Sequence, residues 1–127
     1  MNDKALQICS YEQSQRLKAA GFDWPVYDFY NGTILDCDGK DNYNNLNDYI
    51  SVPSVSLGLK WLRGVKGFYG YVYRKSNGYF HAEWNVFLKN GHFQSFGIEQ
   101  SDLKTYEEAE SYLLDDMIAF LEKSKLL

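Results

Sequence analysis

The side chains with the greatest capacity for chemistry are two histidines, two cysteines and a group of closely spaced aspartates. His81 and Glu83 stand two residues apart in a β-rich run, so they would share one strand face and offer two metal ligands. A zinc site needs a third protein ligand. His92 would lie about 27 Å along the strand from His81 if the turns are two-residue turns. We therefore expect no metal site, and we interpret His81 and Glu83 as part of a hydrated sheet face beside Arg74.

Nucleophilic catalysis would depend on one of the cysteines. Cys9 immediately precedes the predicted helix cap Ser10, a position that can lower a thiol pKa, so it is the better candidate nucleophile. No local pattern places a histidine beside it, and Cys37 belongs to no metal or redox motif. Phosphate-binding glycine loops, nucleophile elbows and HExxH helices are also missing from the sequence. The sequence predicts two free thiols, no catalytic residue and no cofactor.

Asp36, Asp38 and Asp41 with Gly39 resemble part of a calcium-binding loop. The EF-hand loop requires glycine at its sixth position and glutamate at its twelfth. Counted from Asp36, these positions hold Asp41 and Asn47. We therefore interpret the segment as a solvated acidic loop.

The element expected to position the histidine and its neighbours is a three-stranded antiparallel meander over residues 67–98. Asn77-Gly78 and Asn90-Gly91 separate β-rich runs, and Asn-Gly is typical of two-residue type I′ turns. Such turns would pair Arg74 with His81 and Leu88 with Phe93, which sorts the side chains onto two faces.

The face that we assign to the core is apolar almost throughout. It comprises Tyr69, Tyr71, Tyr73, Phe80, Ala82, Trp84, Val86, Leu88, Phe93 and Ser95. The opposite face is mixed in character and is the expected partner surface. Its candidate residues are Phe68, Val72, Arg74, His81, Glu83, Phe87 and Phe96.

Three helices are expected around this sheet. Ser10, Gln13 and Gly21 provide a capping box and a left-handed terminus for a short surface helix. A second helix is predicted over 53–66, capped by Ser51 or Ser54, with an apolar face of Val55, Leu57, Leu59, Trp61 and Leu62. A third begins at Thr105 with a capping box to Glu108, and its buried side is predicted to carry Tyr106, Ala109, Leu113, Met117, Phe120 and Leu121.

Residues 22–30 are predicted to run along a sheet edge, because Pro25 disfavours a central strand. Residues 31–48 are rich in Asn, Asp and Gly and are predicted to be a loop. A long loop in a compact domain is often functional. A pocket between this loop and the sheet would be lined by Trp24, Tyr43, Asn44 and Asn45.

Composition limits the partners. At 127 residues we expect one α+β domain over 1–127, and the net charge of −4 disfavours nucleic acid and anionic membranes. No apolar run reaches the roughly 20 residues that span a bilayer, and the N-terminus lacks the apolar segment of a signal peptide, so we expect a cytoplasmic protein. The order helix, three strands, helix is similar to that of double-stranded-RNA-binding domains. Glu107 and Glu108 at the start of the last helix have the wrong charge for phosphate.

Three stretches carry a resemblance to a known family: 10–23, 52–63 and 105–110. In these stretches the caps, the apolar helix stripe and the terminal helix are similar to those of small uncharacterised proteins carried by phages and mobile elements of gut anaerobic bacteria. The resemblance implies this genetic context and no catalytic residue.

The sequence thus predicts an α+β fold: a three- or four-stranded antiparallel meander, with Val26 to Tyr30 as the possible fourth strand, two helices packed on one face and a short N-terminal helix. The expected function is a non-enzymatic protein-binding accessory module of a phage or mobile element, binding a protein partner or itself as a homodimer. The alternative is a small-ligand binder or weak enzyme that uses the pocket beside the 31–48 loop.

Overall fold

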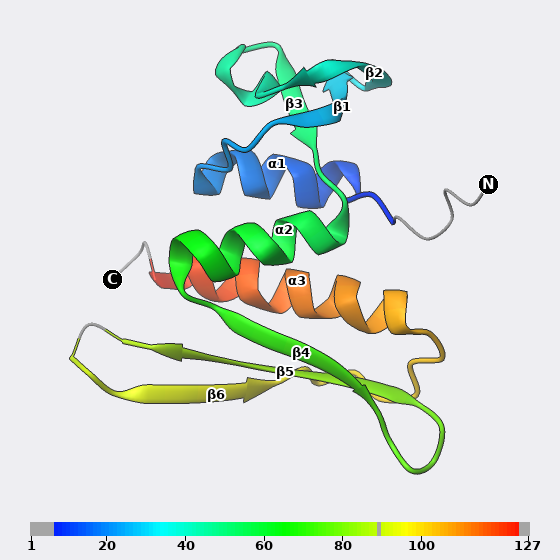
Figure 1. Cartoon of the computed structure of the whole chain (residues 1–127), viewed down its shortest axis with the longest axis vertical. Helices are drawn as coiled ribbons and strands as arrows, with labels where there is room; N and C mark the ends of the chain where they lie inside the picture. Colours follow the sequence, from blue (N-terminus) through cyan, green and yellow to red (C-terminus); the bar gives the residue numbers. More distant parts are fainter. Residues whose placement is uncertain (1–6, 89, 125–127) are drawn as a thin grey trace.

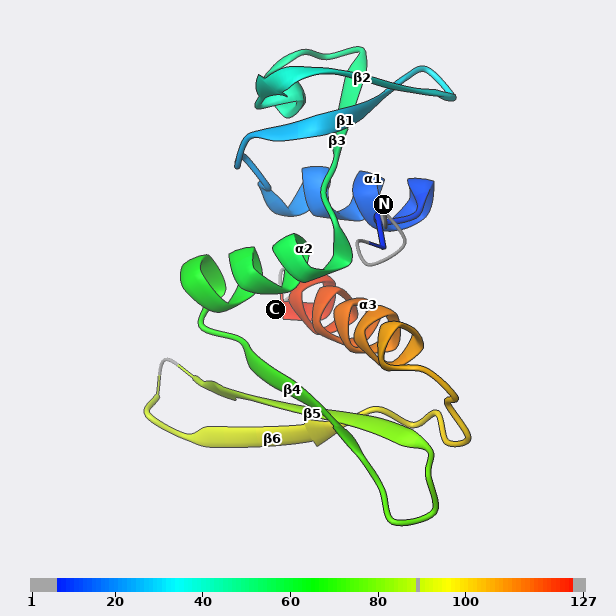
Figure 2. The same ribbon diagram turned by 45° about the vertical axis from the view of Figure 1, so that its right-hand side comes forward.

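Two antiparallel three-stranded sheets enclose a layer of three helices in the computed structural model, which describes residues 7–88 and 90–124 (Figure 1). The first sheet lies on one side of the helices and the second sheet on the other, and a view turned by 45° shows the same layers (Figure 2). The α+β class is confirmed. The prediction of a single sheet was wrong, because the possible fourth strand, Val26 to Tyr30, belongs to a separate sheet. It is the central strand of that sheet and not the predicted edge strand.

The first sheet has the order β2-β1-β3, from β1 (Val26–Asn31), β2 (Ile34–Asp41) and β3 (Tyr49–Val52). The loop predicted over 31–48 therefore contains the whole of β2. Gly32 has a φ of 65° and starts the two-residue connection between the paired residues Asn31 and Ile34. Glycine at that position is typical of a type II′ hairpin, a signal hidden here by the polar composition of the segment.

The second sheet has the order β4-β5-β6, from β4 (Tyr69–Arg74), β5 (Phe80–Phe87) and β6 (Phe93–Gly97). Its register differs by one residue from the predicted register in both hairpins. Tyr73, not Arg74, is paired with His81.

The loop geometry explains the shift. Lys75 N–H donates to the carbonyl of Tyr79 at 2.7 Å, and Gly78 N–H donates to the carbonyl of Lys75 at 2.9 Å. These bonds close a three-residue loop in which Gly78 has a φ of 91° and Asn77 has a negative φ. A type I′ turn would require positive φ at both residues, whereas a type I turn followed by one left-handed residue requires it only at the glycine.

A shift of one residue exchanges the faces of β4 and β6 relative to β5. The face turned toward the helices is therefore formed by Phe68, Val72, Ala82, Trp84, Val86 and Phe96. The face turned away carries Tyr69, Tyr71, Tyr73, His81, Glu83, Phe87 and Phe93.

Helix α1 (Tyr11–Ala20) has the predicted capping box between Ser10 and Gln13, and Gly21 follows it with a φ of 102°. The prediction that it lies on the surface was wrong, since Leu17 is fully buried and the helix lies between the first sheet and the other helices (Figure 1). A thin apolar stripe suffices because Gln13 makes polar contacts to the last helix: its Nε2 donates to Ser111 Oγ and Asp115 Oδ1, both at 3.0 Å.

Helix α2 (Val55–Trp61) is capped by Ser54 and continues into a π-helical segment, η3 (Leu62–Lys66). Helix α3 (Tyr106–Ser124) begins with the predicted capping box, in which Thr105 and Glu108 exchange hydrogen bonds of 3.1 Å. Tyr106 was predicted to be buried but is 44% exposed. The residues of α3 that are fully packed are Ala109, Leu113, Leu114, Met117 and Ile118.

Helix α3 packs closely on the second sheet. A Cβ added to Gly70 of β4 would lie 2.6 Å from Met117 Cε and 2.9 Å from Leu113 Cδ2, so glycine is the residue that permits this approach. Trp84 of β5 is 1% exposed in the same layer.

Candidate functional site

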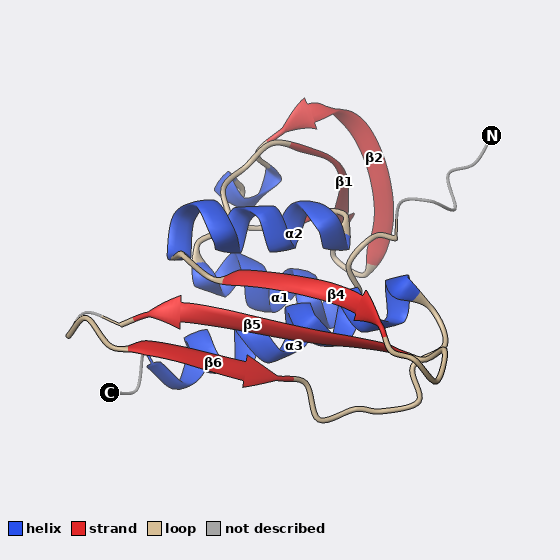
Figure 3. Ribbon diagram, turned by 60° about the horizontal axis from the view of Figure 1, so that its bottom comes forward, coloured by secondary structure: helices blue, strands red, loops and turns tan. Residues whose placement is uncertain are grey.

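The outward face of the second sheet is the most unusual surface in the described part of the chain. Figure 3 shows this face with no helix in front of it. Five aromatic residues on this face are partly exposed: Tyr69 (53%), Tyr71 (52%), Tyr73 (37%), Phe87 (69%) and Phe93 (52%). We call these five residues, together with His81 and Glu83, the outer aromatic face. Large exposed apolar surfaces of this kind usually mark an interaction site.

One end of the outer aromatic face is organised by Glu83. Its Oε1 accepts a hydrogen bond of 2.6 Å from the hydroxyl of Tyr71, and its Oε2 accepts one of 3.3 Å from Tyr73. The hydrogen bond to Glu83 raises the pKa of Tyr71 above its usual value, and partial desolvation followed by the charge of Glu83 raises the pKa of Tyr73. The carboxylate therefore holds two neutral phenols in place on the open sheet.

The other end of this face is apolar. Phe87 and Phe93 are directly paired across β5 and β6, with ring centroids 5.0 Å apart in an edge-to-face arrangement. Because both rings are more than half exposed, most of their apolar area is free for a partner.

The predicted partner residues divide between the two faces. His81, Glu83 and Phe87 lie on the outer aromatic face, whereas Phe68, Val72 and Phe96 point inward. The prediction that all of them share a face was wrong for these three because it assumed two-residue turns. Arg74 lies at the end of β4, with its guanidinium 6.0 Å from the Phe80 ring.

The prediction that the three tyrosines of β4 and Phe93 belong to the core face was wrong for the same reason, since all four are on the outer aromatic face. A usable signal was present, since the tyrosines alternate with Phe68, Gly70 and Val72. The hydroxyl of tyrosine can form hydrogen bonds with water, so tyrosine is more favourable at an exposed position than phenylalanine. The alternation therefore favours an outward orientation of the tyrosines.

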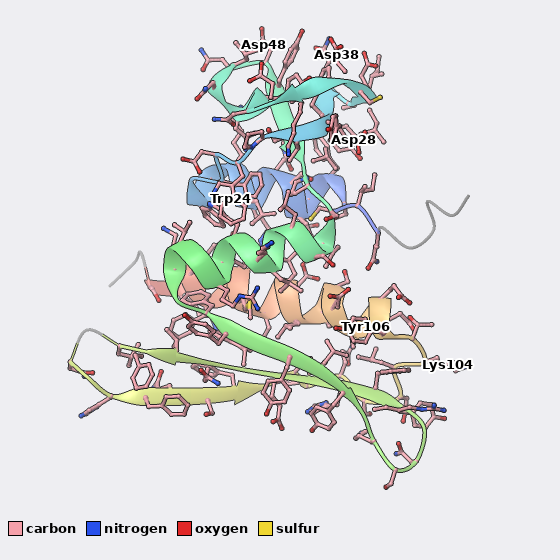
Figure 4. The ribbon with its side chains drawn as sticks, in the orientation of Figure 1. Trp24, Asp28, Asp38, Asp48, Lys104 and Tyr106 are labelled. Atoms are coloured by element: carbon pink, nitrogen blue, oxygen red, sulfur yellow. The ribbon has the colours of Figure 1, made fainter. Side chains whose placement is uncertain are left out.

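A second candidate is a cleft of about 590 Å³ between the first sheet and α2. Among its lining residues are Trp24, Tyr27, Asp28, Lys40, Val52 and Leu57. Figure 4 shows Trp24 nearer the helices and Asp28 in the first sheet.

Only one of the four predicted pocket residues lines this cleft, namely Trp24. Tyr43 is buried, with its ring stacked 4.2 Å from that of Phe29. Asn44 is used structurally, because its Nδ2 donates to the Phe22 carbonyl at 2.9 Å and its Oδ1 accepts from Ser51 N–H at 2.8 Å. Asn45 is exposed. These residues form the short 3-10 turn η2 (Tyr43–Asn45), which anchors the chain to β3.

Cys9 does not have the environment of a nucleophile. It is 1% exposed, and burial, with a smaller contribution from Asp115, raises its pKa to about 12. Its N–H donates to the Pro53 carbonyl at 2.9 Å, which ties it to the connection between β3 and α2. A position before a helix can lower a thiol pKa, but at Cys9 desolvation dominates, so this candidate nucleophile is a buried thiol.

This environment predicts selective alkylation. In native protein at pH 8, iodoacetamide is expected to modify the exposed Cys37 and to react with Cys9 roughly a hundredfold or more slowly. Peptide mass spectrometry over time measures both rates, and denaturant should make them similar. The Cys37→Ser variant provides the control and should take up almost no reagent while folded. Comparable native rates at the two thiols would contradict the described burial.

Within residues 7–88 and 90–124, no three His, Cys, Asp or Glu side chains are close enough together to hold a metal ion. No helix in these ranges combines the length and apolar composition needed to cross a bilayer.

The fold and these two surfaces define an α+β protein with an open aromatic sheet and a separate cleft. No family model matches the chain, and comparison with curated proteins and with solved structures found no similar protein.

Proposed function

We propose that this protein is a non-enzymatic protein-binding accessory module that uses its outer aromatic face as the contact surface. The observation that supports the proposal is the group of five exposed aromatic side chains on a sheet face that no described helix covers. The resemblance to proteins of phages and mobile elements supports a role within such an element.

The area of the face is compatible with a stable interface. An aromatic side chain can bury about 150–250 Å², and roughly half of each of the five rings is exposed, so the rings alone would contribute about 500 Å² per partner. A standard interface buries about 800 Å² on each side. The rings therefore supply most of the area, and tyrosine and phenylalanine are both enriched in such contacts.

The partner that best fits this face is a second copy of the chain. The seven residues of the outer aromatic face include one acidic side chain, Glu83, and its charge is shared with two phenol groups. The whole chain carries −4, so most of the charge that would repel a second copy lies elsewhere. Two apolar faces could then meet around a two-fold axis as an isologous contact.

The experiment measures molar mass by sedimentation equilibrium over a range of concentrations. Wild type is expected to be a dimer, and the double variant Phe87→Glu, Phe93→Glu is expected to be a monomer with an unchanged circular dichroism spectrum. A matched control is the double variant Ile34→Glu, Leu35→Glu, which places the same two charges on apolar residues of the first sheet that are 70% and 46% exposed. This control should remain dimeric.

Two results would count against the proposal. A wild-type monomer at every concentration would refute the second copy as partner. If, in addition, the double variant captures from a host lysate every protein that wild type captures, the face has no role in protein binding.

A further inference from the structure

We propose that the cleft between the first sheet and α2 binds a small zwitterionic molecule with an apolar or aromatic body. This site is separate from the outer aromatic face, and the two proposals can fail independently.

The shape and walls of the cleft favour an apolar ligand body. Its volume of about 590 Å³ is within the range of about 300–1,000 Å³ that is typical of small-molecule sites. Val52 and Leu57 provide aliphatic walls, and the rings of Trp24 and Tyr27 lie at the surface of the cleft. Trp24 is half-buried, so one part of its indole is supported by the protein while another part faces the cleft.

Two opposite charges line the same cleft, and neither has a partner among residues 7–88 and 90–124. Asp28, on β1, is half-buried, and Lys40, on β2, is exposed. Neither side chain has a hydrogen bond or an ion pair with any described residue, and they do not pair with each other. A partly buried carboxylate without a partner is unfavourable, so a ligand ammonium group would gain a charge-assisted hydrogen bond there.

An irregularity of the strands accounts for the position of Lys40. Val26 is paired with Asp41 and Asp28 is paired with Cys37, so three residues of β2 oppose the single residue Tyr27. Bulges of this kind redirect side chains relative to a regular ladder. Lys40 belongs to the bulged segment and lines the cleft.

The pair of charges decides the class of ligand. A cation would satisfy Asp28 and leave the ammonium of Lys40 beside a bound positive charge, and an anion would do the reverse. A molecule with both an ammonium group and a carboxylate satisfies both residues, as a free amino acid does.

Four related probes separate the contributions. They are L-phenylalanine, phenylalanine amide, N-acetyl-phenylalanine and N-acetyl-phenylalanine amide, which are zwitterionic, cationic, anionic and neutral versions of one apolar body. Binding is followed by Trp24 fluorescence and by the indole N–H signals in nuclear magnetic resonance. Trp24 is a suitable reporter because Trp61 and Trp84 are each 1% exposed.

Phenylalanine is expected to bind about tenfold more tightly than either singly charged probe, and the neutral probe most weakly. Asp28→Asn should weaken the binding of phenylalanine and of phenylalanine amide about tenfold. Lys40→Met should weaken the binding of phenylalanine and of N-acetyl-phenylalanine by a similar factor. Asp38→Asn is the matched control, since Asp38 is an exposed acid of β2 outside the cleft lining, and it should change nothing.

The proposal is overturned if none of the four probes shifts the Trp24 signal at millimolar concentration. It is also overturned if all four probes bind equally tightly, or if Asp38→Asn weakens the binding of phenylalanine as much as Asp28→Asn does. Chemical-shift changes confined to the second sheet would likewise exclude the cleft as the site.

Discussion

Replacement of Trp84 by alanine is expected to lower the free energy of unfolding by about 3–5 kcal/mol. Trp84 is 1% exposed, and its ring lies 4.6 Å from that of Phe96 and 5.3 Å from that of Phe120. Its Nε1 also donates to Asp116 Oδ2 at 2.8 Å. Alanine would leave a cavity between the second sheet and α3 and would remove this hydrogen bond. Urea denaturation followed by circular dichroism measures the change.

Two control variants separate the contributions to this loss of stability. Trp84→Phe keeps most of the apolar volume and loses the N–H donor, so a smaller loss of about 1–2 kcal/mol is expected. Phe87→Ala, on the same strand but 69% exposed, should change stability by less than about 0.5 kcal/mol in the monomer. A loss below about 1 kcal/mol for Trp84→Ala would contradict its place in the core.

The second large effect is expected in the first sheet. Phe29→Ala should cost about 3–4 kcal/mol, because Phe29 is 6% exposed and its ring lies 4.2 Å from Tyr43 and 4.9 Å from Tyr49. These rings are contributed by β1, η2 and β3, so the loss should be concentrated there. Amide hydrogen exchange is expected to show protection falling first in residues 26–52, with β4 to β6 still protected.

Tyr27→Ala is the matched control for this variant. Tyr27 lies two residues before Phe29 on β1 but is 59% exposed, so its loss should leave hydrogen exchange nearly unchanged. If Phe29→Ala instead reduced protection equally in both sheets, the two sheets would unfold as one cooperative unit, against the local effect expected here.

The helix ends could be predicted from the sequence because their causes are local. Ser10 with Gln13 and Thr105 with Glu108 form the expected capping boxes, and Ser54 caps α2. Each of these bonds joins residues three apart, so side-chain type and spacing are enough.

The sheet register could not be predicted, because Asn-Gly is compatible with two loop lengths. The dipeptide suits a two-residue type I′ turn and also the last two positions of a three-residue loop. Asn77 Oδ1 accepts from Tyr79 N–H at 3.0 Å, which supports the longer loop and is not visible in the spacing of residues. The strand β2 was missed for a different reason, since its exposed polar residues lack the alternation of a half-buried strand.

The cleft was only partly predictable. Trp24 was named as an aromatic lining residue, but Asp28, Lys40 and Leu57 are brought together by the bulge and by the connection that leads from β3 into α2. Tyr43 was assigned to a pocket although its ring completes an aromatic cluster with Phe29. Contacts between residues distant in the sequence decide such positions.

The three-residue loop at Gly78 has a consequence for how this surface can change through inheritance. Lys75 and Tyr79 flank the loop as a hydrogen-bonded pair, so loss of the codon for Ser76 would leave Asn77-Gly78 as a two-residue turn between the same two residues and keep the register of β4 against β5. A substitution that instead favoured a two-residue turn in the undeleted chain would pair Ser76 with Tyr79, move β4 by one position and turn its tyrosines toward the helices. The aromatic face is therefore compatible with a shorter loop, whereas a change of turn type at constant length would replace its β4 side chains in a single step.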